Sequence, residues 1–412
     1  MGRTVFTNVA IFDGTGAKPY PGEVAVEDKR IAAVAPGNGK IDRSGAAIVD
    51  GKGATLMPGM VEAHAHLSWP CAYDRIILDR TIPPEEHLLI TARNARITLD
   101  HGFTSAYSAG SLGTRFEIAL RDEIDNGWLP GPRLKASSIE RAPGQVFGIP
   151  QSQDASGHGR GAAAMRAYIK SCAEMGLDSV KLLLSGDDNF TPNGSQELAY
   201  DEDEVAAAGD EAEKQGLWLA CHAQAAEAVK LGLKYGFRVL YHCSYADAEA
   251  LDMLEAKKSE IFVAPAVGLA HGAIHADPSL NLPEPLVQRG HKILALQRAL
   301  VPELIRRGLR VLPGGDYGFP HTPIGRNARD LQYFVEDFGF TPAKALMAAT
   351  KWGGEIMGMG EELGLVAEGY LADLLLVDGD PIEDITILQD KDRLLMIMKD
   401  GAYHKAPPSP IY

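Results

Sequence analysis

The middle of the chain alternates short apolar runs with longer amphipathic segments, and this alternation constrains the fold more than any other feature. Between residues 58 and 363, AAMRAYIKSCAEMGLD precedes the apolar run SVKLLLSG, and EDEVAAAGDEAEKQG precedes LWLACHAQ. The apolar runs are typical of strands buried on both faces, and the amphipathic segments are typical of helices that cover them. Alternation over about 300 residues therefore predicts an α/β protein with a TIM-type (β/α)8 barrel.

Both ends of the chain follow another pattern. Short β-rich runs separated by Gly, Pro and Asp turns occur in TVFTNVAIFDG and GEVAVEDKRIAAVAP, and again in GYLADLLLVDGDP and DRLLMIMKDGAYHK. We therefore expect residues 1–57 and 364–412 to form one small β-sandwich domain beside a catalytic barrel at residues 58–363.

The charge balance argues against one broad class of partner. The 412 residues include 40 Lys and Arg against 55 Asp and Glu, which gives a net charge of −15. Because such a chain repels phosphate backbones and anionic membrane surfaces, we expect neither nucleic acid nor membrane as a partner. No apolar run approaches the roughly 20 residues that cross a bilayer, and the N-terminus lacks a secretion signal, so a cytoplasmic location is expected.

The cysteines give no sign of a disulfide framework. Cys71, Cys172, Cys221 and Cys243 form no CxxC pair. This spacing in a large chain is typical of buried, reduced thiols.

The sharpest local signal is the HxH pair in MPGMVEAHAHL, where His64 and His66 close an apolar run. Residues i and i+2 of a strand point to the same face, so both imidazoles can bind one cation. Two neighbouring histidines alone are weak evidence for a metal site.

Lys181 lies inside the strongly apolar run DSVKLLLSG. A buried ammonium is costly and shifts towards the neutral amine, which can add carbon dioxide and become an anionic carbamate able to bridge two cations. In isolation, a lysine in such a strand more often extends its amine past the barrel rim.

Three further polar residues close apolar runs in the second half of the predicted barrel. The apolar run within LWLACHAQ ends in His222, the apolar run within RVLYHCSY ends in His242, and Asp316 follows two glycines in LRVLPGGDYGFP. Reactive groups of such barrels lie at the C-terminal ends of the strands, so these residues should meet the HxH pair. Singly they are more often structural histidines or a turn aspartate, but together they predict a metal site in which Asp316 could accept a proton from a metal-bound water.

The ordered set HxH, Lys, His, His and Asp resembles the amidohydrolase superfamily, specifically its binuclear subtype with a carbamylated lysine. The resemblance extends over almost the whole chain. Stretches such as HAQAAEAVKLGLKYGFRVLYHCSYAD and GLVAEGYLADLLLVDGDP resemble a branch that contains Xaa-Pro and Xaa-Arg/Lys dipeptidases, ochratoxin-degrading amidases, and molinate and phenylurea hydrolases.

The resemblance implies a role for each predicted ligand of two divalent cations, which are usually zinc in this family. His64, His66 and Asp316 would hold the more buried metal, His222 and His242 the second, and carbamylated Lys181 would bridge both together with a hydroxide. The metals would lower the pKa of the bridging water from 15.7 towards about 7, and the hydroxide would attack the substrate carbonyl. The second metal would stabilise the oxyanion, and Asp316 would carry the proton to the leaving amine.

Five residues are candidates for contact with substrate. His271 would lie at the end of the seventh strand and bind the carbonyl or oxyanion, Arg141 could bind a carboxylate, and Tyr245 and Tyr317 lie in rim segments. Trp69 belongs to the aromatic and apolar stretch HLSWPCAYDRIIL, which could line an entrance and favour an apolar or aryl substrate. Each of these residues could equally serve loop structure or packing.

The leading hypothesis is a hydrolase of amide-like C–N bonds in small molecules, such as aryl amides, carbamates, thiocarbamates, ureas or N-acyl amino acids. A Xaa-Pro or Xaa-Arg dipeptidase is an alternative, although SSIERAPGQVFG lacks the histidine found in dipeptidase-like members. A mononuclear deaminase would carry glutamate where this chain has Ala225, and would leave Lys181 without a purpose. A non-catalytic structural homologue is the remaining alternative. The resemblance also implies that the protein forms a homo-oligomer.

Overall fold

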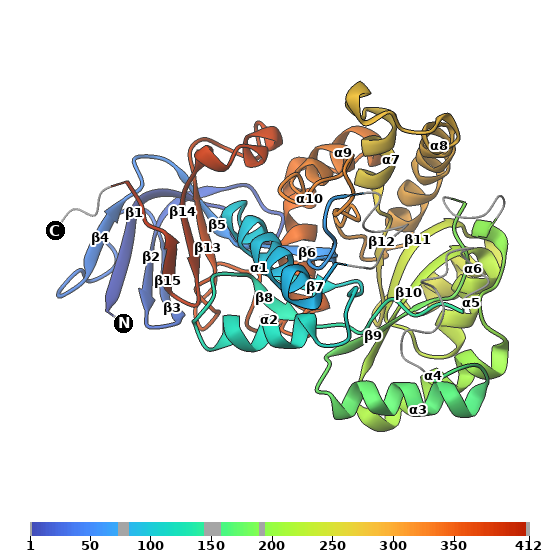
Figure 1. Cartoon of the computed structure of the whole chain (residues 1–412). Helices are drawn as coiled ribbons and strands as arrows, with labels where there is room; N and C mark the ends of the chain where they lie inside the picture. Colours follow the sequence, from blue (N-terminus) through green and yellow to red (C-terminus); the bar gives the residue numbers. More distant parts are fainter. Residues whose placement is uncertain (1, 73–81, 144–157, 189–193, 409–412) are drawn as a thin grey trace.

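The computed structural model describes residues 2–72, 82–143, 158–188 and 194–408. Within this part of the chain, strands from both chain ends form one sheet, and the middle of the chain builds an α/β unit beside it (Figure 1).

Seven parallel strands form the inner layer of the α/β unit. They are β6 (Met60–Ala65), β7 (Phe103–Ser108), β8 (Arg133–Lys135), β9 (Ser179–Leu183), β10 (Trp218–Ala225), β11 (Val239–Tyr245) and β12 (Phe262–Ala264). Each strand of the order β6-β7-β8 and each strand of the order β9-β10-β11-β12 pairs in parallel with its neighbour. Apart from the short β8, these parallel strands are buried along almost their whole length, in agreement with the sequence pattern.

The described strands do not close into one continuous eight-stranded barrel, which the sequence predicts. Single parallel bridges join Ser137 to Ser179 and Arg141 to Leu182 between the two sheets, and Val263 to Val311 beyond β12. The expected eighth strand is reduced to that last bridge, because Pro313 has no backbone N–H to continue a ladder and two glycines follow it.

Helices lie outside these strands (Figure 1). They are α1 (Pro84–Asp100), α2 (Phe116–Asp125), α3 (Ala162–Glu174), α4 (Glu202–Gln215), α5 (Ala226–Lys234), α6 (Ala248–Ala256), α7 (Val267–Ile274), α8 (Glu284–Arg306), α9 (Arg329–Phe338), α10 (Pro342–Ala349) and α11 (Lys351–Ile356). α4 shows how the sequence sets these bounds: Asp201 and Glu204 form a capping box at its start, and Gly216 ends it with φ 69°. None of the helices in the described ranges is both long and apolar enough to cross a bilayer.

The two chain ends share a single eight-stranded sheet, at the place where the sequence predicts one small β-sandwich domain built from both ends. Its strands are β1 (Arg3–Ile11), β2 (Tyr20–Glu27), β3 (Arg30–Pro36), β4 (Ala47–Asp50), β5 (Thr55–Pro58), β13 (Leu374–Val377), β14 (Leu394–Lys399) and β15 (Ala402–Lys405). The order is β15-β14-β13-β5-β1-β2-β3, with β4 beside β1. The two ends meet where β5 pairs antiparallel with β13.

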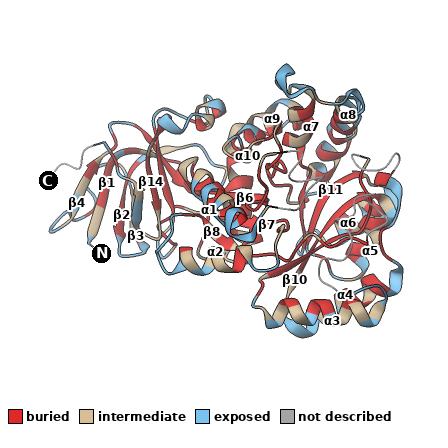
Figure 2. Cartoon of the chain, viewed as in Figure 1, coloured by how far each residue is buried: buried red, intermediate tan, exposed pale blue. Residues whose placement is uncertain are grey.

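Apolar packing and one partly buried cation fix the sheet to the α/β unit. Arg133 on β8 pairs with Asp373 at 2.7 Å and with Asp400 at 2.6 Å, both from the C-terminal part of the chain. Buried residues line the inner strands and the inner helix faces (Figure 2). The four cysteines are free thiols, as predicted, and three of them are buried.

Candidate metal centre

The predicted ligands lie on neighbouring strands of the α/β unit, and all of them are buried. They are His64 on β6, His66 directly after that strand, Lys181 on β9, His222 on β10, His242 on β11, and Asp316 beyond the bridge at residue 311. Each has at most 7% of its surface exposed. The imidazole rings of His64 and His66 lie on one side with their centroids 5.2 Å apart, as the HxH spacing predicts.

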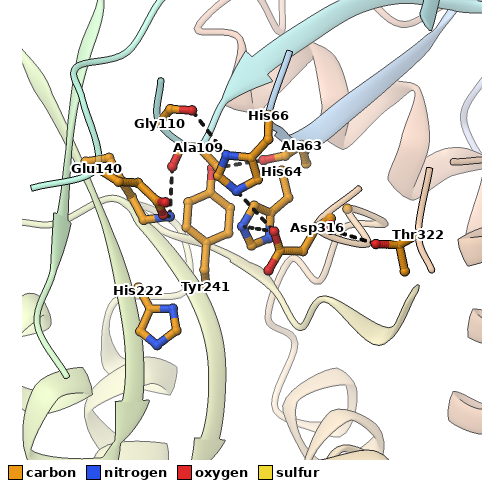
Figure 3. A network of polar contacts seen from close by, with 12 residues as sticks. Ala63, His64, His66, Ala109, Gly110, Glu140, His222, Tyr241, Asp316 and Thr322 are labelled. Atoms are coloured by element: carbon orange, nitrogen blue, oxygen red, sulfur yellow. Dashed lines mark hydrogen bonds and ion pairs between the residues drawn. The ribbon is translucent and has the colours of Figure 1, made fainter. Parts of the chain in front are cut away.

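His66 and Asp316 form the shortest contact of the group (Figure 3). The His66 Nε2 atom lies 3.1 Å from Asp316 Oδ1, and its Nδ1–H donates to the Gly110 carbonyl at 3.1 Å. Burial opposes a charge on His66, but the hydrogen bond to Asp316 raises the pKa of the imidazole above its usual value. Burial likewise opposes the negative form of Asp316, yet the hydrogen bond from His66 lowers the pKa of this carboxyl.

His64 stacks on a tyrosine and keeps one ring nitrogen unused. Its ring centroid lies 3.9 Å from that of Tyr241, whose hydroxyl donates to the Ala63 carbonyl at 3.0 Å. His64 Nε2 is 3.9 Å from Asp316 Oδ1, and Nδ1 is buried without a hydrogen-bond partner among the described residues. Burial and the charge of Lys181 hold the pKa of His64 well below its usual value, so the ring is a neutral nitrogen donor.

His222 and His242 supply a second pair of imidazoles. Their ring centroids are 4.4 Å apart. His222 Nε2 lies 3.2 Å from the Gly186 carbonyl, which fixes the N–H on that nitrogen and leaves Nδ1 as the lone-pair donor. Burial lowers the pKa of His222, and burial together with the charge of His222 holds the pKa of His242 well below its usual value.

Two of the ligand positions have a backbone conformation that side chains rarely adopt. His242 has φ 72° and Asp316 has φ 61°. Such left-handed residues cost of order 1–3 kcal/mol each, and they persist where the surroundings hold them in place. Both residues, together with His64, offer ligand atoms that all lie within 4.8 Å of one another.

The loop around Asp316 is shaped by glycines and by a buried carboxyl. A Cβ at Gly314 would lie 2.8 Å from His64 Cβ, and one at Gly315 would lie 2.5 Å from an Asp330 oxygen. Asp330 accepts from the Gly314 N–H at 3.0 Å and from the Tyr317 hydroxyl at 2.8 Å. These contacts hold the backbone on both sides of Asp316.

Together these features fit a metal ion. Four imidazoles, three of them with lowered pKa values, and one ionised carboxylate are the donor types that zinc and similar divalent cations take. The Nδ1 atom of His64 is buried and has no hydrogen-bond partner among the described residues, and a metal ion bound to its lone pair would satisfy it.

Lys181 is held by groups that the sequence analysis did not find. Its Nζ donates to the Ala109 carbonyl at 2.9 Å, lies 3.2 Å from Glu140 Oε1, and lies 4.2 Å from the centre of the Tyr241 ring. Glu140 belongs to the segment SSIERAPG, in which we singled out Arg141 instead. The rule that singled out His222, His242 and Asp316, a polar residue at the end of a strand-like run, could also have pointed to Glu140.

Trp69 lies against the metal centre. Its ring centroid is 4.4 Å from that of His66 and 4.8 Å from that of Phe319. Leu112 and Leu269 pack against the two aromatic rings. An apolar wall therefore adjoins His66.

His271 is not at the end of a strand, as the sequence predicts, but on helix α7. The chain leaves β12 through Ala266, whose φ is 63°, and α7 begins directly afterwards. His271 Nε2 lies 2.6 Å from Asp337 Oδ2 on α9, and the ring stacks on Tyr333 at 3.8 Å. Burial lowers the pKa of His271. Its contact with substrate stays a prediction.

The other predicted substrate contacts are engaged with the surrounding structure. The Arg141 guanidinium donates to the Gly159 carbonyl at 2.5 Å and lies over the Tyr168 ring of α3 at 4.6 Å. Tyr245 closes β11, with the Lys292 amine 5.1 Å from its ring centre. Tyr317 donates its hydroxyl to Asp330, as described above.

Comparison with known proteins gives matches over most of the chain. The model of the Amidohydrolase family matches residues 55–403. Ochratoxinase from Aspergillus niger is 25% identical over 383 residues, which cover 85% of this chain and 76% of that protein. Imidazolonepropionase from Rubrobacter xylanophilus is 25% identical over 416 residues, covering 92% of this chain and 90% of that protein.

Solved structures share the fold. One is a Xaa-Pro dipeptidase with methionine bound in its active site, which is 23% identical, has a TM-score of 0.84, and covers 98% of this chain and 100% of that chain. The likeness extends through both the sheet of the chain ends and the α/β unit, because it covers nearly all residues.

Proposed function

Since this chain belongs to the amidohydrolase family, we propose that it is a metal-dependent hydrolase that cleaves an amide-like C–N bond in a small molecule. Membership of the family confirms the resemblance drawn from the ordered ligand motifs. Its relatives include ochratoxinase, and ochratoxin-degrading amidases belong to the branch that the sequence resembles.

One observation carries the proposal: His64, His242 and Asp316 bring ligand atoms within 4.8 Å of one another in a buried cluster. His66 and His222 lie beside this cluster, through contacts with Asp316 and His242. We propose that these residues and Lys181 hold two divalent cations, most simply zinc. As the family resemblance implies, His64, His66 and Asp316 would bind the first, His222 and His242 the second, and Lys181 would bridge them as a carbamate.

Bound divalent cations would lower the pKa of water and polarise a carbonyl oxygen at this site. The protein's own contribution is a fixed set of neutral imidazoles and a place for a proton. Asp316 holds His66 through Oδ1, and its carboxylate would accept a proton from the attacking water and deliver it to the leaving nitrogen. The low pKa of Asp316 keeps this acceptor ionised at neutral pH.

Apolar substrates suit the wall beside the centre. Trp69 and Phe319 lie edge to face at 4.8 Å, next to His66. We therefore propose an aryl or otherwise apolar amide, carbamate, thiocarbamate, urea or N-acyl amino acid as substrate. The similarity to ochratoxinase supports this class. Assembly as a homo-oligomer and a cytoplasmic location stay predictions.

Two measurements test the proposal. Elemental analysis of the purified protein should give about two equivalents of divalent metal, and a panel of anilides, carbamates, phenylureas and N-acyl amino acids should show metal-dependent hydrolysis. Protein that binds no metal after loading with zinc would leave only the structural homologue. Metal binding without hydrolysis of any member of the panel would remove the proposed substrate class.

A further inference from the structure

Glu140 lies at the heart of the α/β unit, in an extended segment between two strands. Ile139 forms a bridge with Ser111 on one side, and Arg141 forms one with Leu182 of β9 on the other. The Arg141 N–H donates to the Lys181 carbonyl at 3.3 Å. The backbone of this segment is thereby fixed next to β9, one residue from Glu140.

The side chain of Glu140 faces the metal ligands (Figure 3). Its Oε1 atom lies 3.2 Å from Lys181 Nζ, and only 16% of the side chain is exposed. Gly110 makes room for it, since a Cβ at that position would lie 2.3 Å from Glu140 Cγ. The carbonyl of the same glycine holds His66 in its orientation, so the glutamate and a predicted ligand pack against one residue.

Charge balance shows why a carboxylate here needs a cation. Two dications carry four positive charges, against which Asp316, a Lys181 carbamate and a bridging hydroxide would supply three negative ones, so one further carboxylate would balance the centre. Carbamylation would also replace the ammonium partner of Glu140 by an N–H that carries an anionic carboxyl group, so two anions would lie close together in a buried site, which is unfavourable unless a cation lies near both. Without carbamylation, Glu140 is a carboxylate that lies 3.2 Å from the Lys181 amine, at the position where a bridging anion is needed.

We propose that Glu140 is a direct ligand of the metal centre, in addition to the residues of the HxH, His, His and Asp motifs. The inference rests on the proposed function, because it requires that this cluster binds metal. It holds for either state of Lys181: beside a carbamate, the glutamate shares a cation with it, and beside a free amine, the glutamate is the bridging anion.

The test is the metal content of Glu140→Gln, measured on full-length protein after equilibration in a zinc buffer. The variant keeps the shape of the side chain and removes its charge, and we expect the second equivalent of zinc to be lost or bound at least tenfold more weakly. Glu140→Asp, with a carboxylate on a shorter arm, should recover part of that binding. The visible spectrum of Co²⁺-loaded protein should also change in the glutamine variant, because it reports the number of ligands.

Ser138→Ala is the matched control. Ser138 lies on the same segment and accepts a hydrogen bond from the Lys181 backbone N–H at 3.0 Å, so its loss perturbs the strand without removing a carboxylate. It should retain both equivalents. Circular dichroism would establish that each variant is folded.

Two results would overturn the proposal while leaving the proposed function intact. One is a Glu140→Gln protein that binds two equivalents with wild-type affinity and an unchanged Co²⁺ spectrum. The other is recovery of the lost equivalent on addition of bicarbonate, since Glu140 would then act on Lys181 and not on the metal. A wild-type protein that binds no metal would instead contradict the proposed function itself.

Discussion

Asp330 should make the stability of the metal-free protein depend on pH. The side chain is buried beneath the Asp316 loop, where it accepts hydrogen bonds from the Gly314 N–H and the Tyr317 hydroxyl. Burial outweighs these bonds and raises the pKa of Asp330 to about 7. Burial and the charge of Asp330 also raise the pKa of the neighbouring Glu62 to about 8.

The sign and size of the effect follow from proton linkage. A folded-state pKa of about 7 lies above the usual aspartate value of 3.8, so the folded protein binds the extra proton between these limits and loses stability as pH rises through them. One pKa unit corresponds to about 1.36 kcal/mol. From about pH 5 to pH 7 the wild type should therefore lose about 2 kcal/mol through Asp330, and little more above pH 7.

Replacing Asp330 by Asn isolates this effect. The amide oxygen can still accept from Gly314, and the amide N–H₂ can donate to Tyr317, whose hydroxyl then acts as acceptor. Asparagine does not titrate, so the variant avoids this loss. Between about pH 5 and pH 8, the free energy of unfolding of the variant should rise by about 3 kcal/mol relative to that of the wild type. The pKa of Glu62 should also fall, which enlarges the difference above neutrality.

The assay is urea unfolding in the presence of a chelator at several pH values between about 5 and 8. Exposed Asp203, changed to Asn, controls for the loss of a carboxylate elsewhere. Parallel stability curves for the wild type and Asp330→Asn over this range would refute the reasoning.

Three further predictions concern the metal centre itself. Lys181→Ala should remove the second metal and most activity, as shown by elemental analysis and turnover; full activity with two metals would exclude the bridging role. Asp316→Asn should keep much of the metal but lower kcat by about 10²–10⁴, the usual contribution of a general acid–base group, and an unchanged rate would reject its proton-transfer role. Trp69→Ala should raise KM for aryl substrates more than for small aliphatic ones, because it removes the ring beside His66; equal changes would place the aryl group elsewhere.

The sequence could identify residues whose position depends only on local geometry. The period-two alternation of a strand brings His64 and His66 to one face without any knowledge of tertiary structure. His222 and His242 follow the same logic, because parallel strands deliver their C-terminal ends to one edge. The α/β class and the shared sheet of the two chain ends were accessible for similar reasons.

The sequence does not predict which way a side chain points when its residue lies outside a regular strand or helix. Glu140 and Arg141 are neighbours in an extended segment beyond the three residues of β8. One points to Lys181 and the other to Tyr168 of α3, and only the bridges to β9 settle which. His271 was misplaced for a related reason, since a single left-handed residue, Ala266, converts the expected strand end into a helix.

Among the described strands, the predicted barrel is interrupted between β8 and β9 and again beyond β12, and the second interruption lies where the chemistry is most constrained. A regular eighth strand would continue through residues 313–316, but Asp316 needs φ 61°, and its neighbouring glycines must approach His64 and Asp330 more closely than any side chain allows. Regular pairing and the observed placement of Asp316 are therefore incompatible over these residues. The hydrogen bonds that Asp330 accepts from the Gly314 N–H and the Tyr317 hydroxyl replace part of the missing strand pairing. Asp330 is not itself a predicted metal ligand, but it holds the loop that positions the predicted ligand Asp316.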